Sequence, residues 1–133
     1  MPDRITTGPF RVPSDWVAGQ GLVVTLLNPT NQARTVRVVV DEVIFDGDPP
    51  ACPNTQVAVM TPICQVDVTV PALRAVQTQA TGFTADDVLR VTVSGATDDE
   101  GGLVEVSVVG DRNGAAEPTM FFRHGDFVEV EDD

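Results

Sequence analysis

The chain contains no lysine and no tyrosine, and it has a single histidine, His124, and three serines. Without lysine it has no side-chain amine for Schiff-base chemistry, and none to reach the phosphates in a P-loop. A metal site built on several histidines cannot form within one chain. These absences exclude more classes of function than any motif in the chain indicates.

Positive charge is also scarce. The basic residues number 8, all of them arginine, against 20 acidic residues, so the formal net charge is -12. Because such a surface repels phosphates and anionic lipid, we expect no nucleic-acid partner and no membrane partner. The chain also has no apolar run suited to a signal-peptide core or a membrane span, which predicts a product made in the cytoplasm.

The composition indicates one folded domain with an aliphatic core. Apolar residues make up 42% of the 133 residues, but aromatic residues only 5%. Valine is the most frequent residue, and β-branched side chains favour strands. The run 33–45, ARTVRVVVDEVIF, alternates polar and apolar residues, which predicts a half-buried antiparallel strand. The acidic pair Asp41 and Glu42 interrupts it and indicates a bulge or a turn outward.

The same reasoning divides the chain from residue 21 onward into short strands joined by Gly, Pro, Asn and Asp. The remaining expected strands are 21–27, 56–60, 64–70, 75–81, 88–93, 103–109, 120–123 and 127–131. No convincing helix of about ten residues is present. We therefore predict an all-β fold, a single antiparallel β-sandwich of jelly-roll or Ig-like type with about eight strands, over residues 21–133.

Residues 1–20 are interrupted by Pro2, Gly8, Pro9, Pro13 and Gly19. This segment is predicted to be either a loose arm or an edge strand around 10–12. Its apolar residues have no obvious place in a sheet, and they make it a candidate assembly arm that pairs with a neighbouring subunit; these residues are Ile5, Phe10 and Val12. The alternative is a frayed terminus.

Two cysteines, Cys52 and Cys64, bracket one loop and the strand after it. They are a candidate disulfide, which for a loop of this size contributes about 3 kcal/mol by the chain-entropy argument. The alternative is two unpaired thiols, one of them buried in the sheet. Two thiols and one histidine do not complete a zinc site without carboxylates.

Carboxylates cluster in Gly-containing loops, which are candidate oxygen ligands for Ca²⁺. The candidate residues are Asp46, Asp48, Asp98, Asp99 and Glu100. Solvated loops explain the same clusters, because a chain without lysine must obtain its solubility from carboxylates. His124 is expected to be a turn residue or a strand-end hydrogen-bond donor, since the chain has no G-x-S-x-G nucleophile motif. We expect no enzyme and no cofactor.

Several phrases of the chain resemble, in order, small single-domain β proteins of spore-forming Firmicutes that are similar to endospore-appendage and spore-surface fibre subunits. They span about residues 20–131 and read NPTNQARTVRVVV, CPNTQVAVMTPICQVDVTVP, VLRVTVSG, GLVEVSVVGDRNGAAEP and FRHGDFVEV. The resemblance implies jelly-roll domains that stack through sheet edges, with the N-terminal arm inserted into the next subunit. It also implies release by mother-cell lysis, which needs no signal peptide.

One departure concerns crosslinking. Appendage subunits often carry cysteine in the N-terminal connector, whereas residues 1–20 contain none, which leaves non-covalent strand addition. Isopeptide links are excluded because they need lysine. We expect a structural subunit that assembles with itself into an extracellular or spore-surface filament. The alternative is an Ig-like module that binds a carbohydrate or a protein, with Ca²⁺ in its acidic loops.

Overall fold

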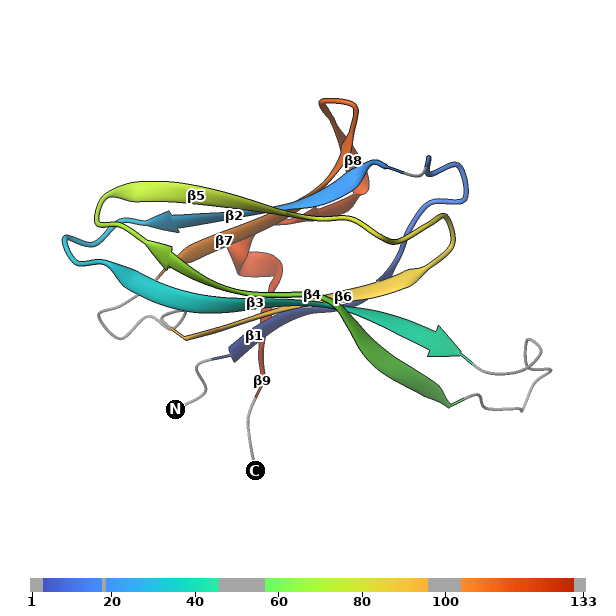
Figure 1. The fold of residues 1–133 in the computed structure, drawn as a ribbon, viewed down its shortest axis with the longest axis horizontal. Coiled ribbons are helices and arrows are strands. Elements are labelled where there is room, and N and C mark those ends of the chain that lie inside the picture. The colour runs from blue at the N-terminus through green and yellow to red at the C-terminus, as the bar shows by residue number, and fades with distance from the viewer. Residues whose placement is uncertain (1–3, 18, 46–56, 96–103, 131–133) are drawn as a thin grey trace.

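The computed structural model describes residues 4–17, 19–45, 57–95 and 104–130, which form two antiparallel sheets packed face to face (Figure 1). The predicted all-β sandwich is confirmed. The five-stranded sheet has the order β4 (Ala58–Val70), β3 (Arg34–Phe45), β6 (Val88–Gly95), β1 (Arg4–Arg11) and β9 (Val128–Val130). The four-stranded sheet has the order β5 (Arg74–Ala80), β2 (Gly21–Asn28), β7 (Glu105–Arg112) and β8 (Ala115–Phe122). A single 3-10 turn, η1 (His124–Asp126), separates β8 from β9.

The core lies between the two sheets and follows the alternation of the sequence. On β3 the side chains of Val36, Val38 and Val40 are buried, while Thr35 and Arg37 point outward. Alternate residues of the neighbouring and facing strands complete this aliphatic core: Leu22, Val24, Leu26, Leu89, Val91, Val93, Val106 and Val108. Removing this apolar surface from water is the main stabilising contribution to the sandwich.

The pairing of β3 with β4 contains the predicted irregularity. The register shifts between Val40 and Asp41, so that Val40 faces Cys64 and Asp41 faces Pro62. Of the bulge and the outward turn expected at Asp41 and Glu42, the register shift corresponds to the bulge, and β3 continues to Phe45. The two strands expected at 56–60 and 64–70 are one continuous strand, β4, because a proline is tolerated on an edge strand.

The N-terminal segment is a strand of the sandwich, which corrects the prediction of an assembly arm over residues 1–20. Strand β1 pairs with β6 along its length and with β9 at residues 4–6, so among the described strands it is an edge only around residues 9–11, which agrees with the alternative of an edge strand there. Ile5 and Val12 are buried in the core of their own chain, and the half-buried Phe10 packs on Phe122 with ring centroids 4.8 Å apart. These three residues are therefore not free to join a neighbouring subunit.

A bulge accommodates the residues that suggested a loose arm. The register of β1 shifts between Thr6 and Pro9, and Gly8 adopts a φ of 72°. The Thr6 hydroxyl donates to the Val91 carbonyl (3.1 Å) and accepts from the Gly8 N–H (3.2 Å). The Thr7 hydroxyl accepts from the Val91 N–H (3.2 Å). These side chains supply hydrogen bonds in the part of β1 where the regular register is broken, so the strand continues through Gly8 and Pro9.

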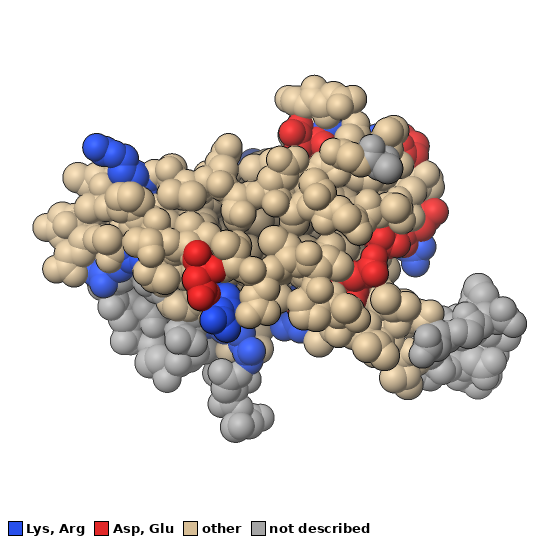
Figure 2. Space-filling model, viewed as in Figure 1, with Lys and Arg blue, Asp and Glu red and all other residues tan. Residues whose placement is uncertain are grey.

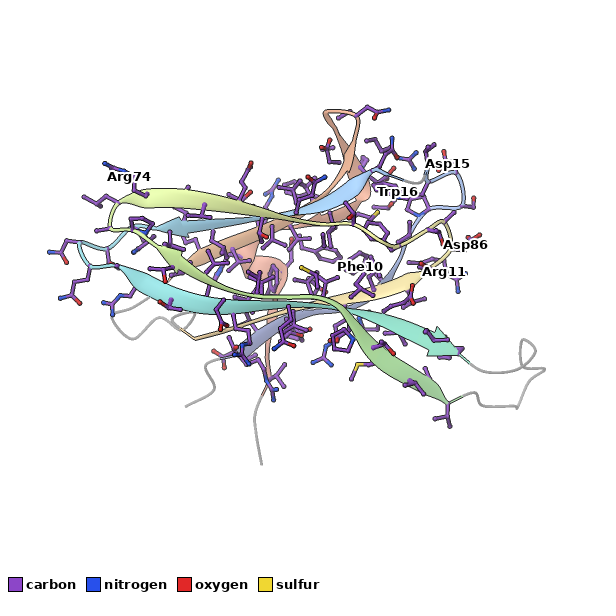
Figure 3. All side chains as sticks on the ribbon, viewed as in Figure 1. Phe10, Arg11, Asp15, Trp16, Arg74 and Asp86 are labelled. Carbon is purple, nitrogen blue, oxygen red and sulfur yellow. The ribbon has the colours of Figure 1, made fainter. Side chains whose placement is uncertain are left out.

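The connection between β1 and β2 is anchored by a cluster of side chains at one end of the sandwich (Figure 3). The Trp16 ring stacks on Phe83, with centroids 5.7 Å apart, and the Arg112 guanidinium lies 5.2 Å from the Trp16 ring centre. Arg112 also donates to Asp15 at 2.7 Å. These contacts fix the connection against β7 and leave the cluster with a structural role.

Asn28, at the end of β2, is a fully buried polar residue. Its amide donates to the carbonyls of Gln32 (2.7 Å) and Val70 (3.0 Å), and its side-chain oxygen accepts from the Thr30 N–H (2.9 Å). The residue therefore ties the turn after β2 to the end of β4. Burial without these partners would be costly.

Candidate interaction surface

The strand β4 leaves one long side of the five-stranded sheet open. Among the strands that the structure describes, β4 pairs with β3 alone. Its 13 residues include one charged side chain, Asp67, which accepts from Arg37 Nε at 2.8 Å and Arg37 Nη2 at 3.3 Å. The Arg37 hydrogen bond holds the pKa of Asp67 below its ordinary value, so the carboxylate stays ionised beside its counter-charge. A long edge with so little charge can pair with another strand.

The far part of the β3–β4 hairpin, which we call the hairpin end, comprises residues 43–45 and 57–60. Val43 lies between Met60 of β4 and Val88 of β6, and from Ile44, which faces Val59, the hairpin continues as a two-stranded ribbon. Figure 1 shows this ribbon running past the other strands at the right. It carries five of the ten large apolar side chains that are exposed in the described residues: Ile44, Phe45, Val57, Val59 and Met60. Such a concentration of apolar surface is typical of an interaction site.

The carboxyl groups of Glu42 and Asp87 meet where the hairpin end leaves the sandwich. The carboxyl group of Glu42 is hydrogen-bonded to Asp87, and this bond, with some burial, raises the pKa of Glu42 above its ordinary value of 4.5. Asp87 accepts in turn from the Thr84 N–H at 2.8 Å. The shared hydrogen bond joins the base of the hairpin to the loop before β6.

The outer face of the five-stranded sheet has a hollow of about 490 Å³ between β1, β3, β4 and β6. Its lining includes Arg4, Arg37 and Ser94, and no lining residue that the structure describes is aromatic. Besides Arg4, the hollow offers little positive charge to an anion, because Arg37 is already paired with Asp67. It also lacks the aromatic platform on which sugars usually stack, so it gives no support to a carbohydrate site.

The predicted site residues are placed only in part. Cys64 lies on β4, half buried against the core with a free thiol, and Cys52 lies outside the described residues. The predicted disulfide is therefore without support. The candidate Ca²⁺ ligands all lie outside the described residues as well: Asp46, Asp48, Asp98, Asp99 and Glu100. Within the described ranges, no three His, Cys, Asp or Glu side chains gather into a possible metal site, and no helix is long and apolar enough to cross a membrane.

His124 opens the 3-10 turn η1, as expected of a turn residue. Its Nδ1 accepts a hydrogen bond from the Val106 N–H at 3.1 Å. The residue is thus an acceptor at the strand end and not the predicted donor. Because this nitrogen already serves β7, the contact gives His124 a structural role.

Sequence reasoning missed the hairpin end. Its alternating apolar residues look like those of any core strand, and only the position of the opposite sheet leaves them exposed. The usable signal was length, because β3 and β4 span 12 and 13 residues while β2 and β7 span 8 each.

No protein-family model, curated protein or solved structure matches this chain. The resemblance to spore-appendage subunits therefore rests on the sequence alone.

Proposed function

We propose that the protein is a structural subunit that assembles with copies of itself through the edges of its sheets. The observation that carries this proposal is the open β4 edge, which is 13 residues long with one charged side chain that is already paired. Natural sheets usually protect such an edge with charges, in particular lysine, or cover it. This chain has no lysine to do so.

Strand pairing between copies replaces the inserted arm in this proposal. Because β1 occupies a place inside its own sheet, the contact between copies must use edges that remain open. The resemblance to spore-surface fibre subunits favours an extracellular or spore-surface filament as the product of this assembly. The exposed apolar hairpin end adds a surface that a neighbouring subunit would cover.

Sedimentation velocity over a wide range of protein concentrations tests the proposal, with negative-stain microscopy of the concentrated sample. We expect the average mass to rise above the 14.1 kDa of one chain as the concentration increases. The buffer should contain about 0.15 M salt, where the Debye length of about 8 Å limits the repulsion between acidic copies. A single 14.1 kDa species at every concentration would overturn the proposal.

A further inference from the structure

We propose that the occupant of the β4 edge is a second copy of this chain, with the two β4 strands antiparallel to each other. In this arrangement the hairpin end of each copy lies against the opposite end of β4 in the other copy. This inference rests on the proposed self-assembly and deepens it, because it selects one of the open edges and gives the orientation of the two copies.

Charge along the edge distinguishes the two possible orientations. Arg34 lies opposite Val70 at the C-terminal end of β4, and Arg74 follows through a turn closed by the Arg74 N–H and the Pro71 carbonyl at 3.2 Å. We call this part, with residues 70–74, the basic end. At the other end, Asp41 and Glu42 precede the hairpin end on β3.

The two ends are far apart on the molecule. Figure 3 shows Arg74 at the left, whereas Figure 1 shows the β3–β4 hairpin, which contains Asp41 and Glu42, extending to the right; Figure 2 shows most of the acidic side chains of this face in the right half as well. An antiparallel pair sets the basic end of each copy beside Asp41 and Glu42 of the other copy. A parallel pair sets like charges together, and like charges in contact disfavour association.

Apolar surface favours the same orientation. A two-stranded ribbon is marginally stable on its own in water, and the hairpin end exposes apolar side chains from both of its strands. The basic end has a matching apolar residue in Leu73, whose side chain is 65% exposed in the turn after β4. Antiparallel pairing brings the hairpin end towards this turn, so both apolar surfaces lose water.

The edge itself permits the pairing with one interruption. Pro62 has no N–H to donate, so a second strand can bond regularly only on either side of it. The segment 63–70 is the longer part, and it contains Asp67, whose charge is paired with that of Arg37. Because each copy uses the same surface, the contact closes at two copies. A longer assembly then requires a second contact outside β4.

The test compares Val59→Lys with Val128→Lys. Val59 on β4 and Val128 on β9 are 56% and 59% exposed, and both lie on edge strands of the same sheet. Both substitutions change the net charge equally. We expect Val59→Lys to weaken the two-copy association at least ~tenfold by sedimentation, while Val128→Lys leaves it unchanged. Urea unfolding of both variants should show that the fold persists.

A second pair tests the orientation. Arg74→Glu removes positive charge from the basic end, whereas Arg123→Glu makes the same change on the exposed residue after β8. We expect the first to weaken association and the second to leave it unchanged. Equal effects would show general repulsion and overturn the antiparallel arrangement.

The outcomes separate this inference from the proposed function. If the unmodified chain associates but Val59→Lys does not weaken it, the β4 contact is wrong while self-assembly stands. If the unmodified chain is monomeric throughout, the proposed function fails and this inference fails with it.

Discussion

The register of β2 makes a sharp prediction about two adjacent leucines. Leu26 is fully buried in the core, whereas Leu27 is 42% exposed on the outer face of the four-stranded sheet. Leu26→Ala removes packed atoms and leaves a cavity, which costs about 3 kcal/mol of unfolding free energy. For a chain of 133 residues the unfolding entropy near the midpoint is about 0.3 kcal/mol/K, so the melting temperature should fall by about 10 °C.

Leu27→Ala is the matched control, because it makes the same chemical change one residue away. Its side chain is already partly in water, so the loss should be about 1 kcal/mol or less. Urea unfolding followed by circular dichroism measures both variants, with similar m-values expected. Equal losses, or a larger loss for Leu27→Ala, would refute the register, because a slip of one residue exchanges the two faces of the strand.

Three further predictions concern polar groups. The raised pKa of Glu42 means that the folded state keeps a proton that the unfolded state releases, so this contribution to stability is lost as the pH rises above about 4.5. The urea midpoint of unfolding should therefore fall between pH 4 and pH 8, and Glu42→Gln should make that fall smaller. The lowered pKa of Asp15, caused first by its hydrogen bond with Arg112, has the opposite sign: its contribution is lost as the pH falls through the folded value, below the ordinary 3.8. Asp15→Asn should therefore reduce the loss of stability in an acid titration. Asn28→Asp replaces the amide donor that serves the carbonyls of Gln32 and Val70, the second of these bonds being buried, and should destabilise the fold by about 2 kcal/mol in urea unfolding.

Alternation predicted the strands well because one face of each is buried. The run 33–45 fixed which valines of β3 enter the core, and the acidic pair within it marked the bulge. Both signals are local, since they depend on the period of the side chains and on the cost of burying charge. Such signals do not predict which strands pair with each other. Here some neighbouring strands are far apart in the sequence, as β1 and β6 are.

The Gly and Pro residues of the N-terminal segment led to the wrong prediction of a loose arm. Gly8 and Pro9 normally end a strand, but here two threonine hydroxyls make the hydrogen bonds that keep the strand joined to β6. Proline also lies where β1 has left β9, because β9 pairs with residues 4–6. A missing N–H therefore costs little at Pro9. That compensation depends on tertiary neighbours, which composition does not contain.

The distribution of the acidic residues bears on which edge meets another copy. Two chains of net charge -12 approach closely only where their surfaces carry few carboxylates. Edge β9 carries Glu129 and is followed in the sequence by three further acidic residues, whereas β4 has a single carboxylate held by Arg37. Charge therefore protects β9 in the way that lysine protects other edges, and β4 lacks this protection. Thr69→Glu adds a carboxylate at an exposed position of β4 and should accordingly suppress association through that edge. The new charge would protect β4 as Glu129 protects β9.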